Sequence, residues 1–442
     1  MKAFPAIAIA LLLGAATAQT ATAKPVNEAD PEQLRATVER LVGFGTRHTL
    51  SDPDHPERGI GAARRWAASV FGEIGEQCGG CITVETIDRR FFGPRAPDGA
   101  NVIDVLGIQR GSGDPDDIII ISAHIDSRVS DPMDFTSDAP GANDDGSGTA
   151  LVIEAARMLS QQRFGPTIVY ALLSGEEQGL WGGQLLAETA QARGWRVRAQ
   201  LNNDIVGNST GQDGRIVDDL VRVFSEGIRA SEPLDQAMNR RNSGSEDDGP
   251  SRALMRAADR VAKGLGASGL QVFGVRRPDR FGRGGDHLPA LVLGFPAVRF
   301  TVGVENYDHQ HQDLRTEDGR KYGDTIDEMD FAYLARVTNV NVALARELAM
   351  APLAPDAATL AGAVSTDTTV SWSPVKGASA YRIYWRRADS MDWADSVLVE
   401  GGETSSHVFK GVIVDDHFFG VAAVADNGSE SIITFAGLPP RR

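Results

Sequence analysis

Cysteine is nearly absent from this 442-residue chain, which has only Cys78 and Cys81, in the segment QCGGC. A zinc knuckle needs two more soft ligands than this pair supplies. The glycines of the segment indicate a turn, not the strand-then-helix context of a redox-active C-x-x-C motif. We therefore expect a structural disulfide, which constrains the unfolded chain only modestly because its loop is short.

Basic residues are also few relative to acidic ones, with 44 Lys and Arg against 60 Asp and Glu and a formal net charge of −16. This balance argues against nucleic acid or an anionic membrane surface as a partner. Beyond the N-terminus no apolar run is long enough to span a bilayer, so no membrane span is expected in the mature protein. The hydrophobic content of 42% is enough for two folded domains.

The N-terminus has the pattern of a secretory signal peptide. Lys2 precedes the apolar run AFPAIAIALLLGAATA, and A-x-A cleavage sites follow at 16–18 and 21–23. The alternative, a membrane anchor, is disfavoured because the apolar run is too short to cross a bilayer comfortably. We therefore expect residues 1–23 to be removed and the protein to be exported, to the periplasm or outside the cell.

Residues 24–350 carry the pattern of an α/β domain. The apolar runs 118–121 and 167–173 read as buried strands, and the helical stripe of 147–162 lies between them. Strand, helix and strand at this spacing form a βαβ crossover. Further strands are expected at 82–87, 100–108 and 220–224, and helices at 253–265 and 327–350. The expected fold is a mostly parallel central sheet flanked by helices.

Residues 351–442 have a different composition. After the linker 351–356 there is no convincing helix, and short strands rich in aromatic residues alternate with turns. This pattern is typical of a small all-β sandwich. The segments WSP (372–374), AYRIYWRR (380–387) and HFFGVAAV (417–424) resemble a fibronectin type III module. The sandwich is expected to contact substrate, a cell surface or the α/β domain.

Metal-type ligands follow the apolar runs at several places in the α/β domain. They are His124 and Asp126 in IIIISAHIDS, Asp144 and Asp145 in PGANDDGSG, Glu176 and Glu177 in IVYALLSGEEQG, Asp204 in QLNNDIVGN, and His311 after LVLGFPAVRFTV. Side chains placed just beyond parallel strands meet at one edge of the sheet. Acids gathered there repel one another unless a divalent cation offsets their charge. The pattern therefore predicts a metal centre.

Zinc prefers imidazole and carboxylate ligands, and a pair of zinc ions needs about five protein ligands, one of them shared. His124, Asp144, Glu177, Asp204 and His311 supply that number and those types. We therefore expect two zinc ions per chain.

Two further acids are suited to roles beside the metals. Asp126 lies two residues after His124 on an extended strand, so it can orient that imidazole and raise its basicity. Glu176 points away from its neighbour Glu177 and is expected to stay uncoordinated, as the general base of a hydrolysis.

The segments HID, GANDDGSG, SGEEQG, NNDIVGN and DHQHQD together resemble the five motifs of the exported zinc aminopeptidases. This family includes bacterial leucyl aminopeptidases, glutamate carboxypeptidases and glutaminyl cyclases, and the resemblance spans roughly 38–350. It implies that Asp144 bridges two zinc ions, that Glu177 and His311 complete one site and His124 and Asp204 the other, and that Glu176 shuttles the proton. It also implies a cis peptide bond at Asp144–Asp145.

The last motif departs from the family pattern, in which a histidine is followed by T-P and an acid. Here the chain reads His309-Gln-His311-Gln-Asp313. We prefer His311 as the ligand, because its distance to Asp313 and to the following helix fits better, and His309 is the alternative. The pair Asp286-His287 resembles a D-H near the substrate pocket of relatives, although such a pair is more often a loop feature.

The resemblance implies an aminopeptidase acting on peptides. A carboxypeptidase or a glutaminyl cyclase on the same scaffold is the alternative, and four arginines keep the first of these open: Arg276, Arg277, Arg280 and Arg283. A different class of protein, a non-catalytic adhesion or receptor-like protein, is disfavoured because no metal ligand is missing.

Overall fold

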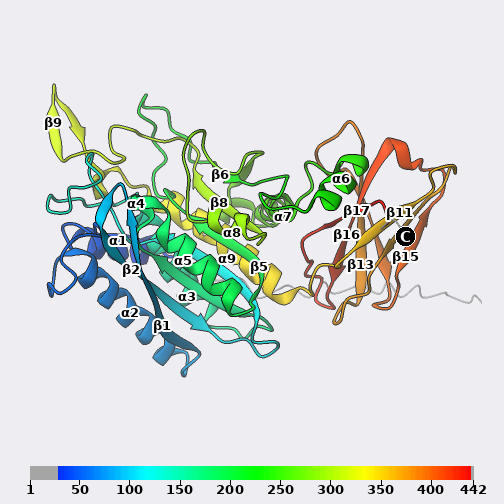
Figure 1. Cartoon of the computed structure of the whole chain (residues 1–442), viewed down its shortest axis with the longest axis horizontal. Coiled ribbons are helices and arrows are strands. Elements are labelled where there is room, and N and C mark those ends of the chain that lie inside the picture. The colour runs from blue at the N-terminus through cyan, green and yellow to red at the C-terminus, as the bar shows by residue number, and fades with distance from the viewer. Residues whose placement is uncertain (1–27, 440–442) are drawn as a thin grey trace, which may run out of the picture.

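The computed structural model describes residues 28–439, so the predicted signal peptide lies outside the described residues. The α/β domain contains an eight-stranded sheet with the order β1-β2-β4-β3-β5-β8-β6-β7 (Figure 1). The strands are β1 (Ile82–Gly93), β2 (Ala96–Gln109), β3 (Asp117–His124), β4 (Thr167–Leu173), β5 (Arg196–Asn203), β6 (Leu220–Phe224), β7 (Gln271–Val275) and β8 (Ala297–Val302). The central strands β4, β3, β5 and β8 are parallel. The predicted α/β fold is confirmed.

Helices cover both faces of this sheet. Ile119 and Ile121 of β3 belong to a core with α1 (Pro31–Val42), α2 (Gly59–Gln77), α3 (Gly146–Leu159), α7 (Pro250–Gly264) and α9 (Phe331–Met350). Ile118 and Ile120 belong to a second core with α5 (Trp181–Ala192). Because both faces of β3 are buried, its sequence is apolar throughout and shows no alternation. Within residues 28–439, no helix has the length and hydropathy to cross a membrane.

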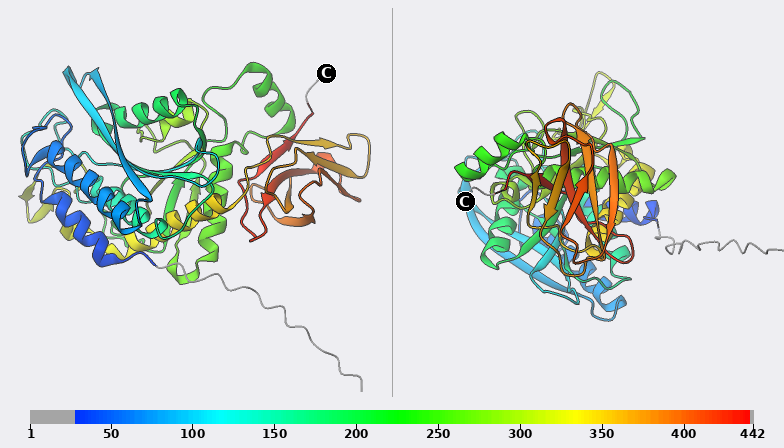
Figure 2. Two further views of the ribbon diagram at one scale, coloured as in Figure 1. Left: turned by 90° about the horizontal axis from the view of Figure 1, so that it is seen from below. Right: turned by 90° about the vertical axis from the view of Figure 1, so that its right-hand side faces the viewer.

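Two elements differ from the sequence expectations. β1 and β2 form one long antiparallel hairpin, paired as far as Gly93 with Ala96, which projects beyond the rest of the sheet (Figure 2). The outer part of the hairpin was not predicted from the sequence, because the residues near its tip are polar and show no strand pattern. The helix α6 (Leu234–Ser243) was not expected, because it has no buried side chain and so no apolar stripe. It lies against β17 (Thr434–Gly437) of the second domain.

Short elements connect these parts. They are α4 (Glu176–Gly179), α8 (Leu288–Val292), η1 (Gly266–Ser268), η2 (Ile326–Glu328) and the hairpin of β9 (Arg315–Glu317) and β10 (Arg320–Tyr322). The predicted disulfide between Cys78 and Cys81 is present at the end of α2.

The predicted all-β domain is also confirmed, as one nearly closed seven-stranded sheet with the order β14-β13-β16-β17-β11-β12-β15. Besides β17, its strands are β11 (Ala358–Ala361), β12 (Thr368–Trp372), β13 (Ala380–Arg387), β14 (Asp395–Glu400), β15 (Ser406–Phe409) and β16 (His417–Val424), with η3 (Val414–Asp416). Its core is aromatic, and the rings of Trp372 and Tyr381 lie 5.1 Å apart. The alternating aromatic residues of the sequence therefore form the inner face of the sheet.

A buried ion pair joins the two domains. Arg386 of β13 donates from two nitrogens to the Asp248 carboxylate, at 3.0 and 2.8 Å, and both side chains are only 2% exposed. Arg256 of α7 donates to the same carboxylate at 2.6 Å. The Arg386 guanidinium also stacks on Trp393, 4.4 Å from its ring centre. The all-β domain is thus held against the α/β domain by a desolvated charge cluster.

Replacing Asp248 with alanine is expected to lower the free energy of unfolding by about 3–5 kcal/mol, because it leaves the buried Arg386 without its carboxylate. Chemical denaturation followed by circular dichroism measures this change. The matched control is Asp389→Asn, which removes an exposed partner of Arg387 and should leave the transition unchanged. Equal stability of Asp248→Ala and the unsubstituted protein would contradict a structural role for the cluster.

Candidate metal centre

The five predicted metal ligands lie together at the carboxyl edge of the central parallel strands. His124 is the last residue of β3, and Asp204 directly follows β5. Asp144 lies in the loop before α3, Glu177 in α4, and His311 in the loop after β8. The carboxyl ends of the parallel strands therefore bring these residues to one edge of the sheet, where open α/β folds have their sites.

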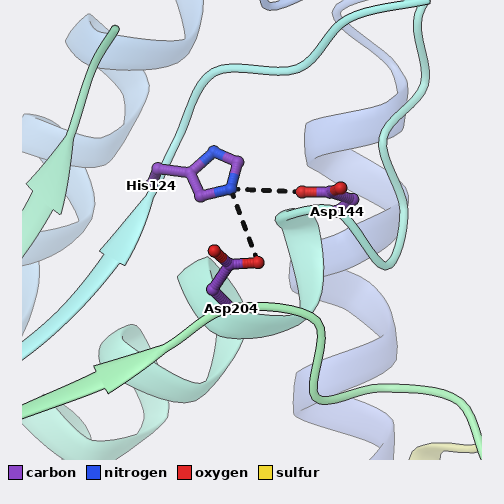
Figure 3. Close-up of side chains that lie close together, drawn as sticks. All are labelled: His124, Asp144 and Asp204. Carbon is purple, nitrogen blue, oxygen red and sulfur yellow. Dashed lines mark ion pairs between the residues drawn. The ribbon is translucent and has the colours of Figure 1, made fainter. Parts of the chain in front are cut away.

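One group of ligands consists of His124, Asp144 and Asp204 (Figure 3). Nε2 of His124 lies 3.1 Å from Oδ1 of Asp144 and 3.9 Å from Oδ1 of Asp204. All three side chains are buried. The imidazole and both carboxylates therefore converge on one point.

The second group consists of Asp144, Glu177 and His311. Nε2 of His311 lies 2.9 Å from Oδ2 of Asp144 and 3.0 Å from Oε1 of Glu177. Asp144 thus presents one oxygen to each group. His309, the alternative ligand, lies elsewhere, with Nδ1 3.7 Å from Oε2 of Glu328.

The residues present are suited to divalent zinc. Nε2 of His124 and Oε1 of Glu177 are buried, and their only polar contacts with the described residues are the ion pairs within the two ligand groups. Burying polar atoms without hydrogen bonds costs folding free energy, and the nearby carboxylates also repel one another. A bound cation would offset both costs. Imidazole nitrogen and carboxylate oxygen are also the donors that zinc prefers.

The pKa shifts of these groups have the same electrostatic origin. Burial lowers the pKa of His311, but the carboxylates of Glu177 and Asp144 outweigh it and raise that pKa to about 9. Burial likewise opposes protonation of His124, yet Asp145, Asp126 and Asp144 raise its pKa well above the usual value. The negative electrostatic potential of the carboxylates, which favours a proton on each imidazole, also favours a divalent cation beside it.

Asp126 connects the two groups behind the ligands. Its main-chain oxygen lies 3.1 Å from Nδ1 of His124, and its carboxylate Oδ1 lies 3.5 Å from the same nitrogen. Oδ2 accepts hydrogen bonds from Thr49 Oγ1 at 2.9 Å and from the Glu177 main-chain N–H at 3.3 Å. Asp126 is therefore positioned to orient both His124 and Glu177.

Glu176 lines the open side of the centre. Burial raises the pKa of its carboxyl well above the usual value, and the nearby Asp204 and Glu177 add to the shift. Its carboxylate is therefore more basic than that of an ordinary glutamate, as a general base requires.

Two arginines beside the ligands could not be assigned from the sequence. Nε of Arg128 donates to Oε2 of Glu177 at 2.7 Å, and Nη2 of Arg299 lies 2.8 Å from Oδ1 of Asp204. Arg299 is fully buried in β8. The sequence does contain one indication of this role, because Arg299 is a charged residue in a mainly apolar strand, and buried charges are almost always paired.

Asp324 and Arg47 hold the loop that carries Asp144 from opposite sides. The Asp324 carboxylate accepts from the main-chain N–H groups of Asn143, at 2.9 Å, and Asp144, at 2.7 Å. The fully buried Arg47 donates to the carbonyls of Ile125 and Gly141 in the segment before it, at 2.7 and 2.9 Å. Both contacts are charge-assisted and therefore strong.

Asp313, the acid expected to accompany the last ligand, lies apart from this network. Its Oδ1 accepts from the Ser130 main-chain N–H at 3.1 Å. The β9–β10 hairpin separates His311 from Asp324, so the sequence distance gave no signal that Asp324 returns to the site.

The backbone at the ligands adopts unusual conformations. The Asp144–Asp145 peptide bond is cis, and Ile205 and His311 have φ angles of 60° and 57°. A positive φ is unfavourable for a β-branched residue such as Ile205. Main-chain hydrogen bonds hold Ile205 there, including Val302 N–H to its carbonyl at 2.8 Å. The fold therefore imposes the conformation that follows Asp204.

A cleft of about 480 Å³ opens onto both ligand groups and Glu176. The tip of the β1–β2 hairpin forms part of its wall through Pro94 and Arg95. Asp286 and His287 are not among its lining residues. They are fully buried, where Asp286 accepts from the Gly183 N–H at 3.0 Å and His287 lies 2.8 Å from the Pro278 carbonyl.

Comparison with known proteins agrees with this geometry. The model of peptidase family M28 matches residues 101–332. A probable zinc metalloprotease of Leptosphaeria maculans is 40% identical over 413 residues, which cover 92% of this chain and 94% of the relative. Two solved structures share the fold at 18% identity and a TM-score of 0.50. They are the LapA aminopeptidase of Legionella pneumophila, with 73% of this chain and 71% of that chain covered, and glutaminyl cyclase of Porphyromonas gingivalis, with 72% and 99%.

The relative is similar over nearly its whole length, including the all-β domain. The chain belongs to peptidase family M28, and the zinc metallopeptidase expected from the five motifs is confirmed at the level of the family.

Proposed function

We propose that this protein is a dizinc exopeptidase that removes N-terminal residues from peptides. The observation that carries the proposal is the position of Asp144, whose two oxygens face two different ligand groups. A shared carboxylate with an imidazole and an acid on either side is the donor set of a co-catalytic zinc pair.

Zinc ions held there would polarise the scissile carbonyl and lower the pKa of the attacking water. The chain's own residues do the rest. Glu176 accepts the proton of the water and then delivers it to the leaving amine. Arg128 and Arg299 keep Glu177 and Asp204 in their orientations, because Arg128 donates a charge-assisted hydrogen bond to Glu177 and Arg299 forms an ion pair with Asp204.

A carboxypeptidase is the second candidate, favoured by one specific observation. Arg280 and Arg283 line the cleft, where they could receive a terminal carboxylate. Arg276 and Arg277, the other two arginines considered, are not among the lining residues, and Arg276 pairs with Asp247 at 3.1 Å.

We also propose that residues 1–23 are a cleaved signal peptide and that the mature protein is exported. The disulfide at Cys78 and Cys81 supports this, because disulfides persist in oxidising compartments. The sequence pattern further supports a catalytic domain ending near residue 350 and a fibronectin type III-like module after it.

Replacing Glu176 with glutamine is expected to lower kcat by about 100-fold or more, because the amide cannot carry the proton. Steady-state hydrolysis of aminoacyl p-nitroanilides measures the loss, and metal analysis should find unchanged zinc. Glu188→Gln, on the outer face of α5, serves as the control and should keep full activity. Near-normal turnover of Glu176→Gln would remove this residue from the mechanism.

Metal analysis of the purified protein should find two equivalents of zinc, and a chelator should abolish hydrolysis. His124→Ala and His311→Ala should each lose one equivalent, because each imidazole belongs to one ligand group. His309→Ala, two residues from His311 but outside the groups, should retain both. A stable single equivalent in the unsubstituted protein would refute the dinuclear site.

Replacing Asp324 with asparagine should weaken zinc binding by about 10- to 100-fold. The amide has no negative charge, and its NH2 group replaces one of the two oxygens that accept from the N–H groups of Asn143 and Asp144, so these hydrogen bonds become weaker. Competition with a chromogenic chelator measures the affinity. Asp313→Asn is the matched control, and equal zinc affinity in the two variants would contradict the role of Asp324.

A further inference from the structure

One wall of the cleft is unusually rich in arginine. Arg280 and Arg283 come from the loop 276–287 and alternate there with Gly282 and Gly284. Only Pro94 and Leu180 are apolar among the residues that line the cleft. A pocket for an apolar side chain is lined mainly by apolar groups, so this wall is built for a different ligand.

The arginines of this wall outnumber the carboxylates that face them. Glu305 lies 2.7 Å from Arg222, 2.7 Å from Arg283 and 3.6 Å from Arg280. Glu305 therefore contacts three guanidinium groups, and Asp279 also pairs with Arg280, at 3.2 Å. Burial and repulsion from Arg299 and Arg283 lower the pKa of Arg280. Four arginines thus share three carboxylates: Arg222, Arg280, Arg283 and Arg299 pair with Glu305, Asp279 and Asp204. This network has one more positive than negative charge, which an anion would offset.

Some donors of this wall make no hydrogen bond with the described residues. Arg280 is 8% exposed, and its buried Nη1 has only the 3.6 Å contact with Glu305, which is too long for a hydrogen bond. Its other nitrogens donate to Asp279, at 3.2 Å, and to the Gly284 carbonyl, at 3.0 Å. Arg283 is 31% exposed and makes hydrogen bonds only through Nη1, among the residues described.

The other two arginines of the cleft are engaged with the metal centre. Arg128 donates to the Glu177 carboxylate and to the carbonyl of Val129, and its Nη2 lies 2.6 Å from Nδ1 of His311. Arg95 donates to the Glu177 carbonyl. Arg95 uses only Nη1 for this contact, but it belongs to the hairpin tip on another part of the wall. On the loop 276–287, the arginines that line the cleft are Arg280 and Arg283.

We propose that Arg280 and Arg283 bind a carboxylate of the substrate, so that the cleft selects anionic peptides. The inference rests on the proposed exopeptidase function and specifies its substrate class. The carboxylate comes either from an acidic side chain or from the free C-terminus of a short peptide. Guanidinium groups suit both sources, because their N–H groups match the two oxygens of a carboxylate.

Calorimetry on the zinc-loaded full-length protein separates the two sources. Glutamic acid α-amide and glutamine α-amide differ only in the charge of the side chain. N-acetyl-leucine and N-acetyl-leucinamide differ only in the terminal carboxylate. We expect the charged member of one pair to bind about 10- to 100-fold more tightly than its neutral partner.

The variant Arg283→Gln tests whether the arginines cause this preference. It should reduce the affinity ratio about tenfold while zinc content stays at the level of the unsubstituted protein. Arg280→Gln should act in the same direction. Arg277→Gln is the matched control, since Arg277 lies on the same loop, stacks on the exposed Phe281 and does not line the cleft.

Two results would overturn the proposal. One is equal affinity for the members of both pairs. The other is a preference that survives in Arg283→Gln and Arg280→Gln, since the carboxylate would then be bound by zinc alone. Neither measurement needs turnover, so an inactive protein would count against the exopeptidase and not against the carboxylate site.

Discussion

The arrangement of the site follows from the repulsion among acids that share one buried position. Asp144 faces two ligand groups at once, and its oxygens lie within 3.1 Å of two imidazoles. A carboxylate in that position must be fixed, because a small rotation would withdraw it from one group. Asp324 fixes it through main-chain N–H groups, and Arg47 fixes the preceding segment through carbonyls. The loop is thus held by a carboxylate at its main-chain N–H groups and by a guanidinium at its carbonyls.

The fold supplies the rigidity that such a site requires. β3 is buried on both faces, so His124 at its end has little freedom to move. Two ligands, His124 and Asp204, lie at the ends of central strands, and the other three lie in loops or a short helix at the same edge. Ligands at the ends of packed strands keep their positions better than ligands on loops would. The stability of the sheet therefore contributes directly to metal binding.

The sequence predicted those site residues whose positions follow from a local pattern of strands and polar residues. His124 and Asp204 could be placed because each follows an apolar strand, and parallel strands end at one edge. Arg128, Arg299 and Asp324 could not, since their roles depend on which segments the folded chain brings together. Asp324 reaches Asn143 from 181 residues away, beyond an intervening hairpin. Composition and periodicity carry no information about such a partner, so these residues needed the structure.

A continuous series of charges links the metal centre to the arginine wall. Asp204 pairs with Arg299, which lies 3.3 Å from Asp279, and Asp279 accepts from Arg280. Groups within one charge network do not act independently, because each pair sets the potential felt by the next. A change in charge at either end is therefore transmitted to the other through three buried contacts. The network therefore predicts that the proposed substrate binding at Arg280 and cation binding at Asp204 are coupled, because the cleft and the metal centre share one set of charges.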